Sequence, residues 1–314
     1  MNSIAETPFV DRPRKHEKYD ALIAACRARP PLRTAVVHPC DESSLSAAWE
    51  AARLGLIEPV LVGPEKRIRE LAKGLQLNLG TVEMVDVPHS HAAAEKAVQM
   101  MRAGDGQALM KGSLHTDELM AEVVRKNGGL RTGRRMSHVF IMDVPTYPKP
   151  LFITDAAINI APTLEVKADI VQNAIGLALA LKIGQPKVAI LSAVETVSSK
   201  IPSTIDAAAL CKMAQRGQII GGILDGPLGL DNAISHQAAT AKHIDSSVAG
   251  EADILLVPDL EAGNMLAKEL SFLANADAAG IVLGARVPII LTSRADNLRT
   301  RLASCAVAAL YAAG

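Results

Sequence analysis

The stretch RTAVVHPCDESSLSAAWEAARLGLIEPVLVG, residues 33–63, decides the fold class because it alternates two kinds of segment. Residues 33–38 and 59–63 are short apolar runs typical of buried strands, and residues 44–54 between them have apolar side chains at helical spacing. The same alternation continues, with expected helices at 64–75, 91–103 and 117–126 and expected strands at 81–87 and 108–111. Repeated strand–helix units predict an α/β fold with a parallel sheet flanked by helices.

Three prolines in PTYPKP, residues 145–150, indicate a stiff connection between two parts of the chain. Strands are expected on either side of it and beyond, at 139–144, 151–154, 187–191, 219–225, 254–258, 281–284 and 288–292, with helices at 163–181, 205–215 and 263–274. The last expected helix, 297–313, has no evident partner in the second part. We therefore predict a first α/β domain of residues 1–150 plus 289–314 and a second of residues 151–288.

The composition excludes several classes of protein. Of the 314 residues, 49% are hydrophobic, which is enough for a sizeable core and argues against disorder. The 33 Lys and Arg balance the 33 Asp and Glu, so no general basic field attracts nucleic acid. One Trp, three Tyr and four Phe are too few for base-stacking platforms. We expect no nucleic-acid partner.

The cysteines and the N-terminal sequence indicate the compartment. Cys26, Cys40, Cys211 and Cys305 lack metal-ligand or CxxC spacing, as expected for reduced, mostly buried thiols. The N-terminus lacks the basic and apolar regions of a signal peptide, and the longest apolar candidate, 173–183, contains Lys182. These features predict a soluble cytoplasmic protein without a membrane partner.

Several common motifs are absent. The sequence contains no GxGxxG after a strand, no GxxxxGK[ST], no HExxH and no GxSxG, so dinucleotide, P-loop, zinc-protease and serine-hydrolase chemistry lose their usual support. His89 and His91 flank a serine, a spacing that a surface loop explains more often than a metal site. We expect no metal ligands.

The polar residues at strand ends are the most informative. Residues 289–292 run directly into Ser293 and Arg294, and a helix follows. The free N–H groups at the start of a helix and the planar guanidinium of arginine both favour the binding of an anion such as phosphate. The structural alternative is a polar turn in which Asp296 or Asn297 only caps the helix.

Two other expected strands end in charged residues. Lys111 closes the run 108–111, where a cation suggests an anionic ligand. Asp225, before a Gly-Pro turn, and Asp231, six residues further, could act as general bases or orient a cation. Ordinary turn chemistry and a surface lysine are the alternatives.

Two further strand ends and one loop complete the set. Gly263 and Asn264 begin a helix that includes Lys268, and the hydroxyl-rich loop after 187–191 contains Ser192 and Thr196. The compact basic cluster Arg131, Arg134 and Arg135 could hold a phosphate or pyrophosphate, or could be a solvated turn. Together these ends predict an enzyme with an interdomain cleft for an anionic ligand.

At this point the sequence resembles the phosphate acetyltransferase/phosphate butyryltransferase family. The matching segments are MRAGDGQALMKG at 101–112, GLRTGRRMSHVFIMDVP at 129–145, ILDGPLGLDNAIS at 223–235, SSVAGEADILLVPDLEAGNMLAKEL at 246–270 and LTSRADN at 291–297. The resemblance implies two three-layer α/β domains with a deep cleft, as in isocitrate and isopropylmalate dehydrogenases, and a homodimer. It implies no bound cofactor and no metal, with coenzyme A (CoA) as a substrate.

The resemblance also implies a reaction and some residue roles. The reaction is acetyl-CoA + phosphate = acetyl phosphate + CoA, by direct thiolate attack in a ternary complex. Ser293 matches the family's catalytic serine and Arg294 its phosphate-binding arginine, while the family's aspartate falls on Thr300, so that role is not transferred. The base stays open among Asp225, Asp231 and Asp296.

The remaining roles complete this hypothesis. Phosphate binding is assigned to Lys111, Ser192 and Thr196 beside the arginine. The residues assigned to CoA are Arg131, Arg134, Gly263, Asn264 and Lys268. Alternatives are butyryl transfer, a metal- and NAD-dependent dehydrogenase of similar fold with Asp225 and Asp231 on the ion, and a non-catalytic protein that binds CoA or acyl phosphate.

Overall fold

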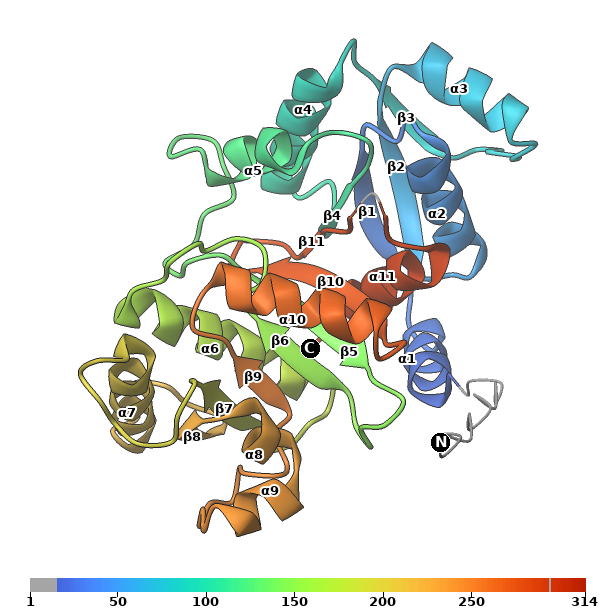
Figure 1. Ribbon diagram of the computed structural model, residues 1–314. Coiled ribbons are helices and arrows are strands. Elements are labelled where there is room, and N and C mark those ends of the chain that lie inside the picture. Colours follow the sequence, from blue (N-terminus) through green and yellow to red (C-terminus); the bar gives the residue numbers. More distant parts are fainter. Residues whose placement is uncertain (1–15, 294) are drawn as a thin grey trace, which may run out of the picture.

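The computed structural model describes residues 16–293 and 295–314, which form one eleven-stranded sheet with helices on both faces (Figure 1). The strand order is β3-β2-β1-β4-β11-β10-β5-β6-β9-β7-β8. The strands are β1 (Leu32–Val37), β2 (Ile57–Gly63), β3 (Glu83–Asp86), β4 (Ala108–Lys111), β5 (Ser137–Asp143), β6 (Leu151–Thr154), β7 (Lys187–Leu191), β8 (Ile223–Leu228), β9 (Ile254–Leu256), β10 (Asp277–Leu283) and β11 (Ile289–Ile290). The helices are α1 (Glu17–Arg27), α2 (Glu42–Arg53), α3 (Glu65–Gly74), α4 (Ser90–Ala103), α5 (Thr116–Val124), α6 (Leu164–Ala180), α7 (Pro202–Gln215), α8 (Leu230–Ile234), α9 (His236–Ala241), α10 (Leu260–Phe272) and α11 (Leu298–Ala312).

The sheet is mixed, which corrects the expectation of a parallel sheet. The outer strands pair in parallel, but β5–β6, β5–β10 and β10–β11 are antiparallel. The connections 144–150 and 284–288 are too short for a parallel crossover, which needs a dozen or more residues. As a result β6, β9, β7 and β8 run opposite to β4 and β11.

The helices make the fold three-layered. The apolar residues of α1, α2, α3, α6, α7 and α11 pack in one cluster on one sheet face, and those of α4, α5, α8, α9 and α10 pack in two clusters on the other. Adjacent strand residues alternate between the faces, as Val36 and Val37 do, because successive side chains of a strand point to opposite sides.

Helix α11 agrees closely with the expected helix 297–313. It begins after Asn297, whose Oδ1 accepts a hydrogen bond from Thr300 N at 2.9 Å, and its residues from Thr300 to Leu310 are buried. It packs on α1, α2 and β11, which belong to the predicted first domain, and also on β10, which belongs to the predicted second domain. The division at residue 150 stays a prediction, and β5 and β6 pair across it.

Other boundaries differ from the expectations. The expected strand 219–225 is β8, four residues later, and α10 begins three residues before 263 because Asp259 Oδ1 accepts from Ala262 N at 2.9 Å. The short helices α8 and α9 and the N-terminal helix α1 were not expected. Within the described residues, no helix combines the length and apolar character needed to cross a membrane.

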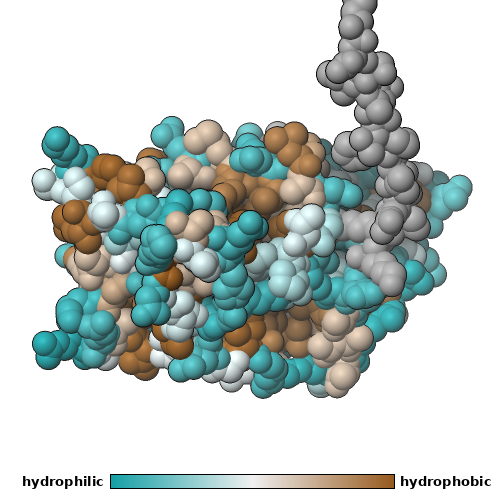
Figure 2. Space-filling model, turned by 60° about the horizontal axis from the view of Figure 1, so that its bottom comes forward, coloured by the Kyte–Doolittle hydropathy of each residue, from teal (hydrophilic) through white to brown (hydrophobic). Residues whose placement is uncertain are grey.

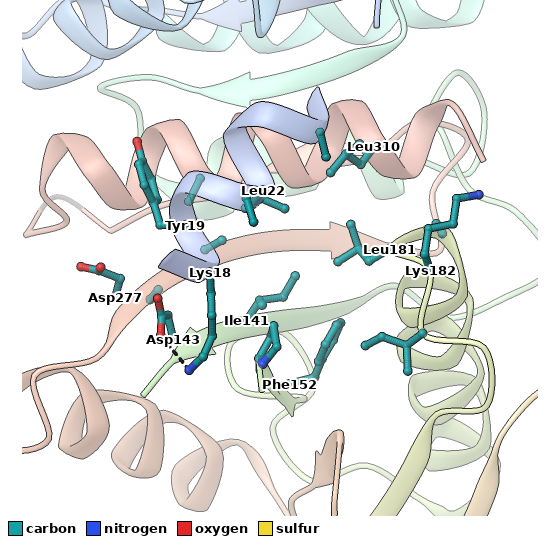
Figure 3. Close-up of a pocket in the computed structure, with 18 of the residues that line it drawn as sticks. Lys18, Tyr19, Leu22, Ile141, Asp143, Phe152, Leu181, Lys182, Asp277 and Leu310 are labelled. Carbon is teal, nitrogen blue, oxygen red and sulfur yellow. Dashed lines mark ion pairs between the residues drawn. The ribbon is translucent and has the colours of Figure 1, made fainter. Parts of the chain in front are cut away.

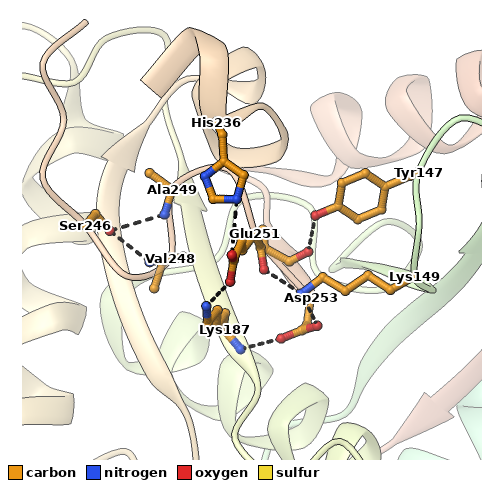
Figure 4. Close-up of polar contacts among 10 residues, drawn as sticks. Tyr147, Lys149, Lys187, His236, Ser246, Val248, Ala249, Glu251 and Asp253 are labelled. Carbon is orange, nitrogen blue, oxygen red and sulfur yellow. Dashed lines mark hydrogen bonds and ion pairs between the residues drawn. The ribbon is translucent and has the colours of Figure 1, made fainter. Parts of the chain in front are cut away.

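A polar cluster ties the proline-containing connection to the start of β9 (Figure 4). Tyr147 donates to Ala252 O at 2.7 Å, and Lys149 Nζ lies 2.6 Å from both Glu251 O and Asp253 Oδ1. Asp253 also accepts from Lys187 N at 2.8 Å. The connection between the two parts is therefore held in place by specific polar contacts.

Gly112 sets the spacing between β1 and β4. A Cβ at this position would lie 2.3 Å from Val37 O and 2.6 Å from His38 O, both backbone atoms. We predict that Gly112→Ala lowers the free energy of unfolding by about 1–3 kcal/mol, because the strands must separate. Gly184→Ala, where a Cβ meets nothing within 4 Å, is the matched control. Urea unfolding checks both variants, and equal midpoints would contradict the prediction.

Candidate functional site

Adjacent strands β1, β4 and β11 are parallel and end at one edge of the sheet. The residues that end or follow them are His38, Lys111 and Thr292. All three are buried, and Lys111 is only 6% exposed. Lys111 Nζ donates to Gly112 O at 3.3 Å. Lys111 places a positive charge at this edge of the sheet, and a positive charge in such a position suits a negatively charged ligand.

The turn after β11 brings Ser293 and Asp296 together. Ser293 N donates to Asp296 Oδ2 at 2.6 Å, and Ser293 Oγ accepts from Ala295 N at 3.4 Å. The Ser293 side chain is exposed, so its hydroxyl can meet a ligand. Arg294 lies outside the described residues, and its predicted phosphate role stays a prediction.

Arg301 on α11 fixes this turn and was not identified from the sequence. Arg301 is 4% exposed, and its guanidinium donates to Thr292 Oγ1 at 3.1 Å, Ser293 O at 2.9 Å and Asp296 O at 3.3 Å. The only sequence signal is that Arg301 directly precedes the largely apolar segment LASCAVAAL, residues 302–310. A planar fork with several donors suits three oxygens on one side of a helix.

Asp296 is the carboxylate that the structure places beside Ser293 and Lys111. Burial raises the pKa of Asp296, while the Ser293 N–H and the charges of Arg301 and Lys111 act in the opposite direction. A carboxyl group with a raised pKa is a stronger base than an ordinary surface aspartate. Among the three candidate bases, this one has the surroundings that proton transfer needs.

The loop after β6 is a second ordered polar segment. Asp155 is buried, and its carboxylate accepts from Ala157 N at 2.9 Å and from Asn159 Nδ2 at 2.6 Å. Asn264 on α10 donates to Ala156 O at 3.2 Å, and a Cβ at Gly263 would lie 2.9 Å from Asp155 O. Gly263 and Asn264 therefore hold this loop against α10.

The structure does not bring Asp225 and Asp231 to the Ser293 turn. Asp225 lies on β8, and seven strand spacings of about 4.8 Å separate β8 from β4, roughly 30 Å along the sheet. Asp231 pairs with Lys242 at 2.9 Å in an ion cluster with Glu195.

Three other predicted residues also lie elsewhere. Ser192 Oγ is 2.8 Å from Ser203 Oγ after β7, and Thr196 is exposed in the same loop. Lys268 is exposed on α10. The strand β7 runs opposite to β4, so its carboxyl end lies at the other edge of the sheet from Lys111.

The basic loop lies at the other end of the central strands. Arg131 forms a bridge with Ala285, and Thr132 Oγ1 donates to Gly284 O at 2.6 Å. Because β10 is antiparallel to β11, this end of β10 lies beside the start of β11 rather than beside Ser293. The side chains of Arg131 and Arg134 are exposed there.

A buried cation and a serine at a turn before a helix, gathered at the ends of parallel strands, define an α/β protein suited to an anionic ligand. Residues 90–309 match the family model for phosphate acetyl/butaryl transferase. The chain belongs to this family, as the sequence indicated. No cluster of three or more His, Cys, Asp or Glu placed for a metal ion occurs in the described part of the chain.

Relatives and solved structures agree with this assignment. A phosphate acetyltransferase of Rhizobium meliloti is 68% identical over 301 residues, covering 96% of this chain and 95% of that protein. A phosphate butyryltransferase of Clostridium beijerinckii is 41% identical, covering 95% and 98%. The crystal structure of a branched-chain phosphotransacylase from Enterococcus faecalis matches with a TM-score of 0.78 at 29% identity, covering 90% and 99%.

The fold extends to a more distant enzyme. A 4-hydroxythreonine-4-phosphate dehydrogenase from Burkholderia phymatum matches with a TM-score of 0.55 at 11% identity, covering 90% of this chain and 98% of that one. This likeness concerns the fold alone.

His138 on β5 is a buried histidine close to the end of β11. A Cβ at Gly280 would lie 3.0 Å from His138 Nε2 and 2.8 Å from Leu291 O, so the ring and the strand end pack around Gly280. Burial lowers the pKa of His138 to about 4, and the Asp155 carboxylate and the Leu291 carbonyl only partly offset this.

We predict that His138 makes folding stability sensitive to pH. Between its ordinary pKa of 6.5 and the folded value of about 4, the unfolded chain binds a proton that the folded chain does not. The free energy of unfolding therefore falls as the pH is lowered through this range. Urea unfolding of His138→Leu should show a shallower fall, while exposed His91→Gln should match the wild type. Parallel curves for all three proteins would disprove this assignment.

Proposed function

We propose that the protein catalyses reversible transfer of an acetyl group between CoA and inorganic phosphate, as a phosphate acetyltransferase. Family membership and the 68% identical acetyltransferase support the activity. The structural observation that supports it best is the grouping of Lys111, Ser293 and Asp296 at one strand edge. This grouping offers a cation for phosphate, a hydroxyl and a base.

The proposed mechanism is one displacement in a ternary complex. Lys111 and Arg294 hold the phosphate group of acetyl phosphate, and Asp296 takes the proton of the CoA thiol. The thiolate attacks the acetyl carbonyl, the new C–S bond forms, and the C–O bond to phosphate breaks. Ser293 Oγ donates a hydrogen bond to the oxyanion as it develops. Fixed donors of this kind stabilise charge that appears only during the reaction.

The basic loop, whose Arg131 and Arg134 were assigned to CoA, does not lie in contact with the Ser293 turn. The site also does not support the dehydrogenase alternative. The paired aspartates required for a divalent ion, Asp225 and Asp231, are engaged with Gly226 N and Lys242 instead. Butyryl transfer is the second candidate, because the 41% identical relative is a phosphate butyryltransferase. The greater likeness to the acetyltransferase favours acetyl.

The proposal includes features of the whole protein. These are two dehydrogenase-like domains with a cleft between them, a homodimer, no bound cofactor and a cytoplasmic location. Figure 2 shows apolar groups among hydrophilic ones on one face of the molecule. On α10 the exposed fractions of Met265 and Phe272 are 64% and 77%, which supports a contact surface between subunits. Light scattering after gel filtration tests the dimer.

The activity test is thioester formation from CoA with acetyl phosphate and, separately, with butyryl phosphate, in the presence of a chelator. We expect turnover with both and a higher kcat/KM with acetyl phosphate. A preference for butyryl phosphate would identify butyryl transfer as the activity and would leave the proposed mechanism unchanged. Absence of thioester from either would overturn the proposed function.

Asp296→Asn tests the base. The amide oxygen can still accept from Ser293 N, so the turn is kept while the proton acceptor is lost. We predict a fall in kcat of about 10²–10⁴. Because burial raises the pKa of Asp296, its charge destabilises the folded chain at pH 7, and the variant should melt at the same or a higher temperature.

Asp231→Asn tests the alternative base in the same assay. Since Asp231 lies in an exposed pair with Lys242, we expect kcat within about twofold of wild type. A larger loss in Asp231→Asn than in Asp296→Asn would reverse the assignment of the base.

A further inference from the structure

A cavity of about 460 Å³ lies beneath α1 (Figure 3). Its floor is the sheet face formed by β5, β6 and β10, and the end of α6 and one side of α11 close it. Leu22, Ile141, Phe152, Leu181 and Leu310 are among the apolar side chains that line it. This volume lies within the range of small-molecule sites, which are mostly apolar with a few placed polar groups.

At one end of the cavity the charges are paired. Lys18 Nζ lies 2.9 Å from Asp143 Oδ1 and donates to Tyr147 O at 2.7 Å. Asp277 Oδ2 lies 2.6 Å from His16 Nδ1. Figure 3 shows Lys18, Asp143 and Asp277 together at this end, with Lys182 at the other. A ligand therefore gains little electrostatic attraction at the paired end.

At the other end two cations line the cavity, Lys182 after α6 and Arg29 after α1. Within residues 16–293 and 295–314, no carboxylate forms an ion pair with either side chain. The arrangement thus combines an apolar interior with one cationic end.

The backbone at Lys182 gives a second observation. Lys182 has φ of 69°, in the left-handed region, and directly follows the C-cap Leu181. Ile183 N donates to Ala178 O at 3.0 Å across this turn, the pattern of a helix end that usually has glycine. A lysine here has a strained backbone, because residues other than glycine disfavour the left-handed conformation.

We propose that this cavity binds an aliphatic carboxylate of medium chain length. The chain occupies the apolar interior, and the carboxylate pairs with Arg29, whose fork accepts two carboxylate oxygens, and with Lys182. The site is separate from the proposed acetyl-transfer site, because none of Lys111, Ser293 and Asp296 lines it. Acetate, without a chain, would leave the apolar interior empty.

The test is isothermal titration of the full-length protein with decanoate below its micelle concentration. We expect saturable binding of one decanoate per chain, at least tenfold tighter than 1-decanol or decyltrimethylammonium, and no measurable binding of acetate. Equal affinity for the carboxylate and the cationic amphiphile, or no saturation with decanoate, would overturn the proposal.

Binding of the carboxylate head group and binding of the aliphatic chain of the ligand are tested by separate variants. Lys182→Gly removes the cation and relieves the left-handed strain, so decanoate affinity should fall about three- to tenfold while the melting temperature stays the same or rises. Ala25→Phe, on the lining face of α1, should reduce affinity at least tenfold. Ala24→Phe, exposed on the same helix but not lining the cavity, is its matched control. Equal affinities for the two phenylalanine variants would refute the site, and acetyl-transfer assays would report separately on the proposed function.

Discussion

The site depends on one buried guanidinium. Strand β11 contributes only Ile289 and Ile290 to the sheet, too short a ladder to fix the chain beyond it. Arg301, 4% exposed, supplies the missing constraint through bonds to Thr292, Ser293 and Asp296. Loss of these oxygens would leave a buried guanidinium without partners and would strongly destabilise the folded chain. The turn and α11 must therefore keep their relative positions.

The same helix joins the site to the rest of the core. From Thr300 to Leu310, α11 is buried against β10, α1 and α2. Ser304 Oγ donates to Thr300 O at 2.7 Å and accepts from Gly280 N at 2.9 Å. The apolar face of α11 thus fixes its position, and from that position Arg301 holds the Ser293 turn. Stability and site geometry come from the same element.

Much of the fold could be predicted from the sequence, because apolar periodicity reports directly on helices and strands. The final helix and the Ser293 turn before it are the best examples. The strand directions could not be predicted, since they follow from the short connections around residues 144–150 and 284–288. With β7 and β8 reversed relative to β4, Ser192 and Asp225 cannot share an edge with Lys111. Arg301 was missed because a side chain's burial partners appear only once the chain is folded.

A comparison of two aspartates shows that the surroundings of a carboxylate set its strength as a base, and the sequence did not reveal these surroundings. Asp231 and Asp296 both follow strands, but their surroundings differ in kind. The hydrogen bond and charge of Lys242 lower the pKa of Asp231, which makes it a weaker base. Burial raises the pKa of Asp296, and the nearby cations of Lys111 and Arg301 limit that rise without cancelling it. A carboxylate that must take a thiol proton and remain charged beforehand needs this balance of burial and positive charge. Position in the sheet, rather than spacing in the sequence, therefore favours Asp296 over Asp231 as the proposed base.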